Sequence, residues 1–298
     1  MSVAPVASQQ PVTDGETTRK RGWGWLLIIP GMLWLAIFFL FPTIQLLGTS
    51  LYDPNGSFEF GYNMTWHFQN YVDAIQDNAK FFVRSFAYAG IATLTCLLLG
   101  YPLAYAIAFK SGRWKNFMLV LVIAPFFTSF LLRTITWQSI LSDQGWVVDT
   151  LKWLHILGPD GRLLATSFAV VAGLTYNFLP FMTLPIFASL DKIDPRLIEA
   201  SSDLYANPFT GLRKVTFPLS MPGVVSGTLL TFIPACGDYI NAELLGTPQQ
   251  FMIGNKIQDL YLRQKDYPAA ATLSIILMVI VLVMVLFYIR RAGTEELV

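Results

Sequence analysis

The stretch DPRLIEASSDLYANPFTGLRKVTFPLSMPG, residues Asp194–Gly223, lies between two long apolar runs. Six of its residues are charged, and much of it can form helix, so it has no physical reason to enter lipid. We therefore interpret it as a surface that the chain presents outside a membrane.

Two helix-start signals divide this stretch. Asp194-Pro195 places an N-cap residue before a proline at the first helical position, and a short amphipathic helix is expected from there to about Ala206. Asn207-Pro208 repeats the signal, and Pro218 is expected to end the second helix. The pattern predicts a short helix–turn–helix between two membrane helices.

The rest of the chain predicts an all-α, polytopic membrane protein. Of its 298 residues, 54% are hydrophobic and only 13% are charged, about half the charge of an ordinary soluble domain. Six apolar runs are each long enough to cross about 30 Å of hydrocarbon as a helix. They fall at roughly 23–47, 83–109, 117–141, 163–190, 221–245 and 269–289.

The basic residues predict how these six helices are oriented. With both termini on one side, 12 of the 20 Lys and Arg residues fall in the segments on that side, so the positive-inside rule places both termini in the cytoplasm. Residues 1–21 then form a disordered cytoplasmic tail, 22–291 a transmembrane domain with a cytoplasmic loop at 191–220, and 292–298 a second cytoplasmic tail.

Composition also argues against several kinds of site. The two cysteines, Cys96 and Cys236, lie in apolar runs, and the two histidines, His67 and His155, are far apart, so neither a disulfide scaffold nor a metal site is expected. A net charge of +1 argues against a nucleic-acid partner. Helix prolines such as Pro180 favour a transporter over a plain anchor, because the backbone groups they free need protein or water as partners.

The loop at 191–220 resembles the "EAA loop" of inner-membrane permease subunits of binding-protein-dependent ABC importers. That pattern reads Glu-Ala-Ala, three residues, Gly, about nine residues, and then I-x-L-P, in which apolar residues stand at the I and L positions. Here the matching positions are Glu199, Ala200, Ser201, Asp203, Leu204, Tyr205 and Pro218. Ser201 replaces the second alanine, and Tyr205 stands where the family has glycine. Because glycine there would allow a left-handed turn, we expect the turn to form instead at Ala206-Asn207.

Two further segments resemble the polyamine branch of this family, the spermidine/putrescine permeases. They are PFFTSFLLRT at 125–134 with Trp137, and GDYINAELLG at 237–246 followed by MIGN at 252–255. The resemblance covers most of the chain from Trp25 to Arg291. Permeases for iron(III), thiamine and sulfate share much of this plan and remain alternatives for the cargo.

The resemblance implies the type I ABC importer permease architecture and a set of partners. These are two ATPase subunits, a second and paralogous permease subunit, an extracytoplasmic substrate-binding protein and membrane lipid. The loop would couple the chain to an ATPase. No G-x-x-x-x-G-K-[ST] motif occurs here, so we expect no catalytic residue, no metal and no cofactor in this chain, with ATP and Mg²⁺ used by the partner.

Charged and aromatic residues in the third and fifth apolar runs are the candidates for a substrate pathway: Arg133, Trp137, Asp238, Tyr239 and Glu243. One interpretation is that the carboxylates and aromatic rings attract a polycation. The other is that Arg133 forms a structural ion pair with Asp238 or Glu243. The sequence leaves both open.

Two other functional classes fit the sequence less well. A self-contained secondary transporter would require inverted repeats and a buried ion relay, and no convincing repeat is seen. An intramembrane enzyme would require a motif such as H-E-x-x-H, which does not occur here.

Overall fold

A computed structural model describes residues 24–56 and 61–292. The predicted tail at 1–21 lies outside the described residues, as does all of the predicted 292–298 tail except Ala292. The chain divides into two units, one up to Gln45 and one from Leu46 onward. The first apolar run is one continuous helical stretch, made of α1 (Gly24–Leu35), a π-helical turn η1 (Ala36–Leu40) and α2 (Phe41–Thr49).

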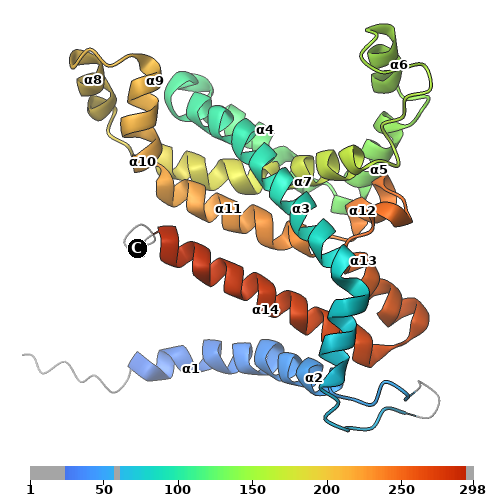
Figure 1. The fold of residues 1–298 in the computed structure, drawn as a ribbon. Coiled ribbons are helices and arrows are strands. Elements are labelled where there is room, and N and C mark those ends of the chain that lie inside the picture. Colours follow the sequence, from blue (N-terminus) through green and yellow to red (C-terminus); the bar gives the residue numbers. More distant parts are fainter. Residues whose placement is uncertain (1–23, 57–60, 293–298) are drawn as a thin grey trace, which may run out of the picture. The chain divides into compact units, whose positions relative to one another are not determined.

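The core of the second unit is built by three helices that pack on one another. They are α3 (Gln69–Tyr105, continued by the π-helical turn η2, Ala106–Lys110), α7 (Ser167–Leu190) and α11 (Met221–Cys236). Figure 1 shows α3 crossing α7, α11 and α14 (Tyr267–Ala292). The helix that contains the second predicted span therefore begins well before residue 83.

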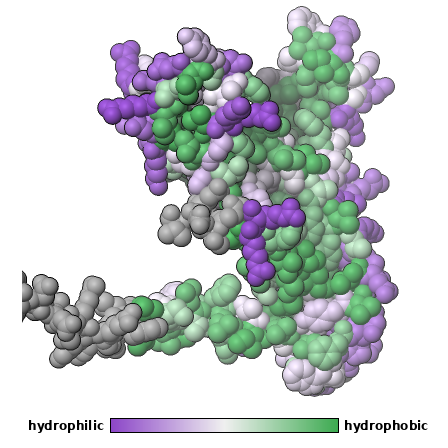
Figure 2. Space-filling model, turned by 60° about the vertical axis from the view of Figure 1, so that its left-hand side comes forward, coloured by the Kyte–Doolittle hydropathy of each residue, from purple (hydrophilic) through white to green (hydrophobic). Residues whose placement is uncertain are grey.

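Small side chains allow these helices to approach closely. Ala89, Ala92 and Cys96 of α3 are buried in the same core as Leu174 and Met182 of α7. Figure 2 shows hydrophobic residues over much of the face in view, and the exposed ones include Ile91, Leu94 and Leu98 of α3, as expected where lipid replaces water around a membrane protein.

The third predicted span, 117–141, is not one straight helix. The 3₁₀ turn η3 (Gly112–Trp114) leads into α4 (Lys115–Ile123) and the 3₁₀ turn η4 (Ala124–Phe127), and the chain then bends by 95° into α5 (Phe130–Leu141). The break follows from Pro125, which lacks a backbone N–H, and from the non-helical backbone of Thr128 and Ser129. A further helix, α6 (Trp146–Trp153), follows.

The fifth predicted span, 221–245, is also interrupted. Helix α11 ends at Cys236, residues 237–239 are not helical, and α12 (Ile240–Leu245) starts a new helix. The restart is stabilised by Asp238, whose carboxylate accepts the backbone N–H of Asn241 at 2.8 Å. The chain continues through η6 (Pro248–Gln250), α13 (Ile253–Gln258) and η7 (Asp259–Gln264) to α14.

The described residues confirm the all-α prediction, since they form no strand and their strand-type pairing is limited to isolated bridges, such as the one between Tyr52 and Met64. Within residues 24–56 and 61–292, four helices are long and apolar enough to cross a membrane, and the number rises to six if each of two bent pairs counts as one span. The second bent pair joins the helices of the predicted cytoplasmic loop to α11.

Candidate functional site

The loop between α7 and α11 forms the predicted helix–turn–helix. Helix α8 (Pro195–Asp203) starts as expected, with the Asp194 carboxylate accepting the backbone N–H of Arg196 at 3.0 Å. Glu199 and Ala200 are exposed on this helix. Ser201 lies 3.0 Å from the position that a Cβ on Gly211 would take, so the residue at the second alanine position faces the next helix.

The turn between the two short helices forms at Tyr205 itself. Its φ is 57°, in the left-handed region, and its side chain is 99% exposed. The expectation of a turn at Ala206-Asn207 was therefore wrong, and the tyrosine adopts the conformation that glycine would favour. Asn207 caps the second helix instead, its side-chain oxygen accepting the N–H of Thr210 at 2.7 Å.

The second half of the loop is a continuous helical run that Pro218 does not end. It consists of α9 (Pro208–Gly211), the π-helical turn η5 (Leu212–Thr216) and α10 (Phe217–Leu219), and it meets α11 at Ser220 with a bend of 69°. A π-helical turn ahead of the proline is one way in which helices accommodate its missing N–H. The bend is held to α3 by a 3.0 Å hydrogen bond between the hydroxyls of Tyr101 and Ser220.

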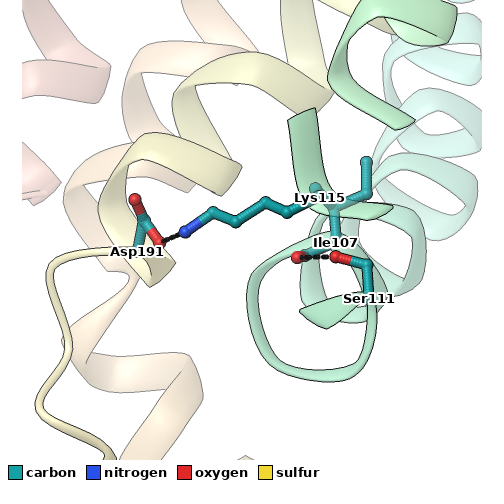
Figure 3. A network of polar contacts seen from close by, with 4 residues as sticks. All are labelled: Ile107, Ser111, Lys115 and Asp191. Carbon is teal, nitrogen blue, oxygen red and sulfur yellow. Dashed lines mark hydrogen bonds and ion pairs between the residues drawn. The ribbon is translucent and has the colours of Figure 1, made fainter. Parts of the chain in front are cut away.

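The other end of the loop is tied to α4. Asp191, directly after α7, forms an ion pair with Lys115 at the start of α4 (Figure 3). The Lys115 ammonium also lies 5.3 Å from the centre of the Phe187 ring. Both roots of the loop are therefore attached to other helices of the same unit, which allows movement of the loop to reach them.

The five candidate pathway residues do not form one cluster of ion pairs. Glu243 lies 3.6 Å from Arg263, and the Asp238 carboxylate accepts hydrogen bonds from the backbone and the side chain of Asn241. Among the described residues, Arg133 pairs with neither carboxylate. The structural ion pair that was one of the two interpretations is therefore not formed.

Arg133 is buried against aromatic rings instead. The centre of its guanidinium lies 5.4 Å from the Phe126 ring and 5.7 Å from the Phe130 ring. Its Nε and Nη1 are buried and have no hydrogen-bond partner within the described part of the chain. Trp137, one turn further along α5, packs on Tyr176 of α7 with ring centres 5.3 Å apart.

A buried polar network joins α12, α7 and α5, and sequence reasoning missed most of it. The Asn177 amide donates to Thr134 Oγ1 at 3.2 Å and to Asn241 Oδ1 at 3.1 Å, and Asn241 donates in turn to Asp238. Nearby, the Asn255 amide donates to the backbone carbonyl of Tyr239 at 2.8 Å. The signal available in the sequence was a pair of amides, Asn177 and Asn241, within apolar runs.

The chain is similar over most of its length to proteins of one kind. The profile of a family described as "binding-protein-dependent transport system inner membrane component" matches residues 97–292. The spermidine/putrescine transport system permease protein PotB of Haemophilus influenzae is 35% identical over 86% of this chain and 90% of that protein. PotB of Escherichia coli K12 is 34% identical over 89% of this chain and 96% of that protein.

Solved structures of importers share the fold. A chain of a bacterial ABC transporter for the acidic polysaccharide alginate superposes with a TM-score of 0.66, at 20% identity over 92% of this chain and 96% of that chain. A chain of the same kind of transporter, in complex with a substrate-bound periplasmic protein, gives 0.65 at 21% identity over 93% and 99%. At this level of sequence identity, the similarity shows the shared fold alone.

Proposed function

The chain belongs to the family of inner-membrane components of binding-protein-dependent transport systems, and from this premise we propose that it carries a polyamine such as spermidine or putrescine. It is a multi-pass permease subunit of the bacterial inner membrane and has no catalytic role in ATP hydrolysis. The observation that carries the polyamine assignment is the identity of 34–35% with spermidine/putrescine permeases over most of the chain.

The assembly that we propose contains one copy of this chain, a paralogous permease subunit, two ATPase subunits and an extracytoplasmic binding protein. ATP and Mg²⁺ would be bound by the ATPase subunits. Both termini and the loop at 191–220 would face the cytoplasm, as the basic residues favour. Closure of the ATPase pair would move the loop, and the packed helices attached to its two roots would transmit that movement.

The network around Asp238 supports a cationic cargo. Asp238 is buried at a break between two helices, and its carboxylate accepts hydrogen bonds from Asn241, which in turn accepts one from Asn177. Burying a carboxylate inside an apolar helical bundle costs free energy, so such residues are usually kept for function. An ammonium group of a polyamine would interact most favourably with this carboxylate in a transport state in which the break between α11 and α12 opens.

Uptake by proteoliposomes that hold the full assembly tests this proposal. We expect ATP-dependent uptake of labelled spermidine, competed by putrescine but not by sulfate, thiamine or iron(III). Asp238→Asn, which keeps the acceptor oxygen and removes the charge, is expected to lower spermidine uptake at least about tenfold while the assembly still forms. Uptake of sulfate in place of spermidine would overturn the polyamine assignment, and uptake by this chain alone would favour a secondary transporter.

A further inference from the structure

Tyr205 combines a strained backbone with an unused side chain. Its φ of 57° is one that L-residues other than asparagine and aspartate rarely adopt, and the side chain is 99% exposed. Among the described residues, no hydrogen bond or ring contact of this tyrosine is found that would favour holding it there. A conformation of this kind indicates a constraint that comes from function.

The residues around Tyr205 form an apolar patch. Leu204 is 81% exposed and Phe209 is 69% exposed, on either side of the turn. Charged, exposed residues of both signs lie in the same loop: Arg196, Asp203, Arg213 and Lys214. Aromatic and aliphatic groups at a centre with charges at the rim are typical of protein–protein interfaces.

We propose that the Tyr205 ring is an anchor that inserts into an apolar pocket on the cytosolic ATPase subunit and helps this permease to select that subunit. This inference rests on the proposed function, which places the loop against an ATPase. A lipid surface fits the patch less well, because burying the ring in acyl chains would bring Asp203 with it.

The left-handed turn gives the ring its position. Tyr205 lies in the turn between α8 and α9, and its side chain projects into solvent. Tyrosine has only two side-chain torsions, so little entropy is lost when such a ring becomes fixed in a pocket. The strain of the free loop would then be offset by contacts made only in the assembly.

Three variants test the inference. Tyr205→Asn keeps a residue that tolerates the left-handed conformation and removes the ring, whereas Tyr205→Phe keeps the ring. Trp66→Asn is the matched control, since Trp66 is also exposed and has a φ of 55° but lies in a different segment. Each full-length variant is purified in nanodiscs with its sibling permease and titrated with the purified ATPase subunit, and its melting temperature is measured.

We expect Tyr205→Asn to weaken ATPase binding by about tenfold or more, with a melting temperature no lower than that of the wild type. Tyr205→Phe and Trp66→Asn should bind like the wild type. Equal binding by Tyr205→Asn and the wild type would overturn this inference alone. Failure of the wild type to bind any ATPase subunit would overturn the proposed function as well, and loss of pairing between permease subunits in Tyr205→Asn would show that the anchor serves another partner.

Discussion

Lys115 and Asp191 form an ion pair that joins the start of α4 to the residue that follows α7 (Figure 3). Asp191 lies three positions before Asp194, the residue that caps the loop helix α8. Helix α4 leads into the 95° break and then into α5, which carries Arg133 and Trp137. The pair therefore connects the base of the loop at 191–220 to the segment that holds two of the candidate pathway residues.

Breaking this pair should affect coupling more than stability. Both side chains are about a third exposed or more, so Lys115→Gln is expected to lower the free energy of unfolding by at most about 1 kcal/mol. In the reconstituted importer we expect less substrate imported per ATP hydrolysed. The reversed pair Lys115→Asp with Asp191→Lys should restore part of that ratio. The pair Arg162–Asp143, between α5 and α7, serves as a control in which Arg162→Gln leaves it unchanged. An unchanged ratio in Lys115→Gln would contradict this role.

Glu199 is exposed on α8 and has no ion-pair partner among the described residues, as expected of a side chain that meets another protein. We expect Glu199→Arg to reduce transport-coupled ATP hydrolysis or to prevent ATPase assembly, without loss of membrane insertion. The measurement is copurification of the ATPase together with its stimulation by the loaded binding protein. Asp160→Arg, the same charge reversal in another exposed segment, is the control and should behave like the wild type. Normal stimulation of Glu199→Arg would count against a coupling role for α8.

The sequence patterns predicted the features that depend on local chemistry. The N-caps at Asp194 and Asn207 formed as expected, because a side-chain oxygen beside the first turn of a helix needs no tertiary information to find its N–H. Four of the six apolar runs likewise became long helices. Hydropathy could not predict the breaks at 128–129 and 237–239, since a run of apolar residues has the same composition whether it is straight or bent.

Tyr205 and Asn177 show where local reasoning ends. Propensity disfavours a left-handed tyrosine, yet Tyr205 has a φ of 57° where the chain turns between α8 and α9. The bonds from Asn177 to Thr134 and Asn241 join residues 43 and 64 positions away along the chain, so their pairing depends on how α5, α7 and α12 pack. Both outcomes are set by tertiary structure.

Arg133 and Arg84 should respond in opposite ways to the same substitution. The buried Nε and Nη1 of Arg133 have no acceptor among the described residues, so Arg133→Met is expected to leave the melting temperature unchanged or to raise it. Arg84 donates from Nη1 to the carbonyl of Phe251 at 2.9 Å, and Arg84→Met should cost about 2 kcal/mol. Thermal unfolding in detergent compares the two. If Arg133→Met unfolds at a lower temperature than Arg84→Met, Arg133 has a stabilising partner in the assembly. If Arg133→Met is stable but imports poorly, the guanidinium serves transport.

Gly223 and Gly90 offer a matched test of how closely α7 and α11 must pack. A Cβ on Gly223 would lie 2.6 Å from the carbonyl oxygen of Pro185 and 2.6 Å from Cβ of Ser189, so neither neighbour can give way without moving backbone. Gly223→Ala is therefore expected to destabilise the protein by about 1–3 kcal/mol.

A Cβ on Gly90, within α3, meets nothing within 4 Å, and Gly90→Ala should stabilise by about 1 kcal/mol because alanine is the better helix former. Since Gly223 lies close to the bend at Ser220, its substitution should also change the angle at which the loop at 191–220 meets α11. We expect Gly223→Ala to lower import even at temperatures where the assembly stays folded, while Gly90→Ala imports normally. Equal melting temperatures for the two variants would mean that the contact between α7 and α11 is looser than the distances at Gly223 require.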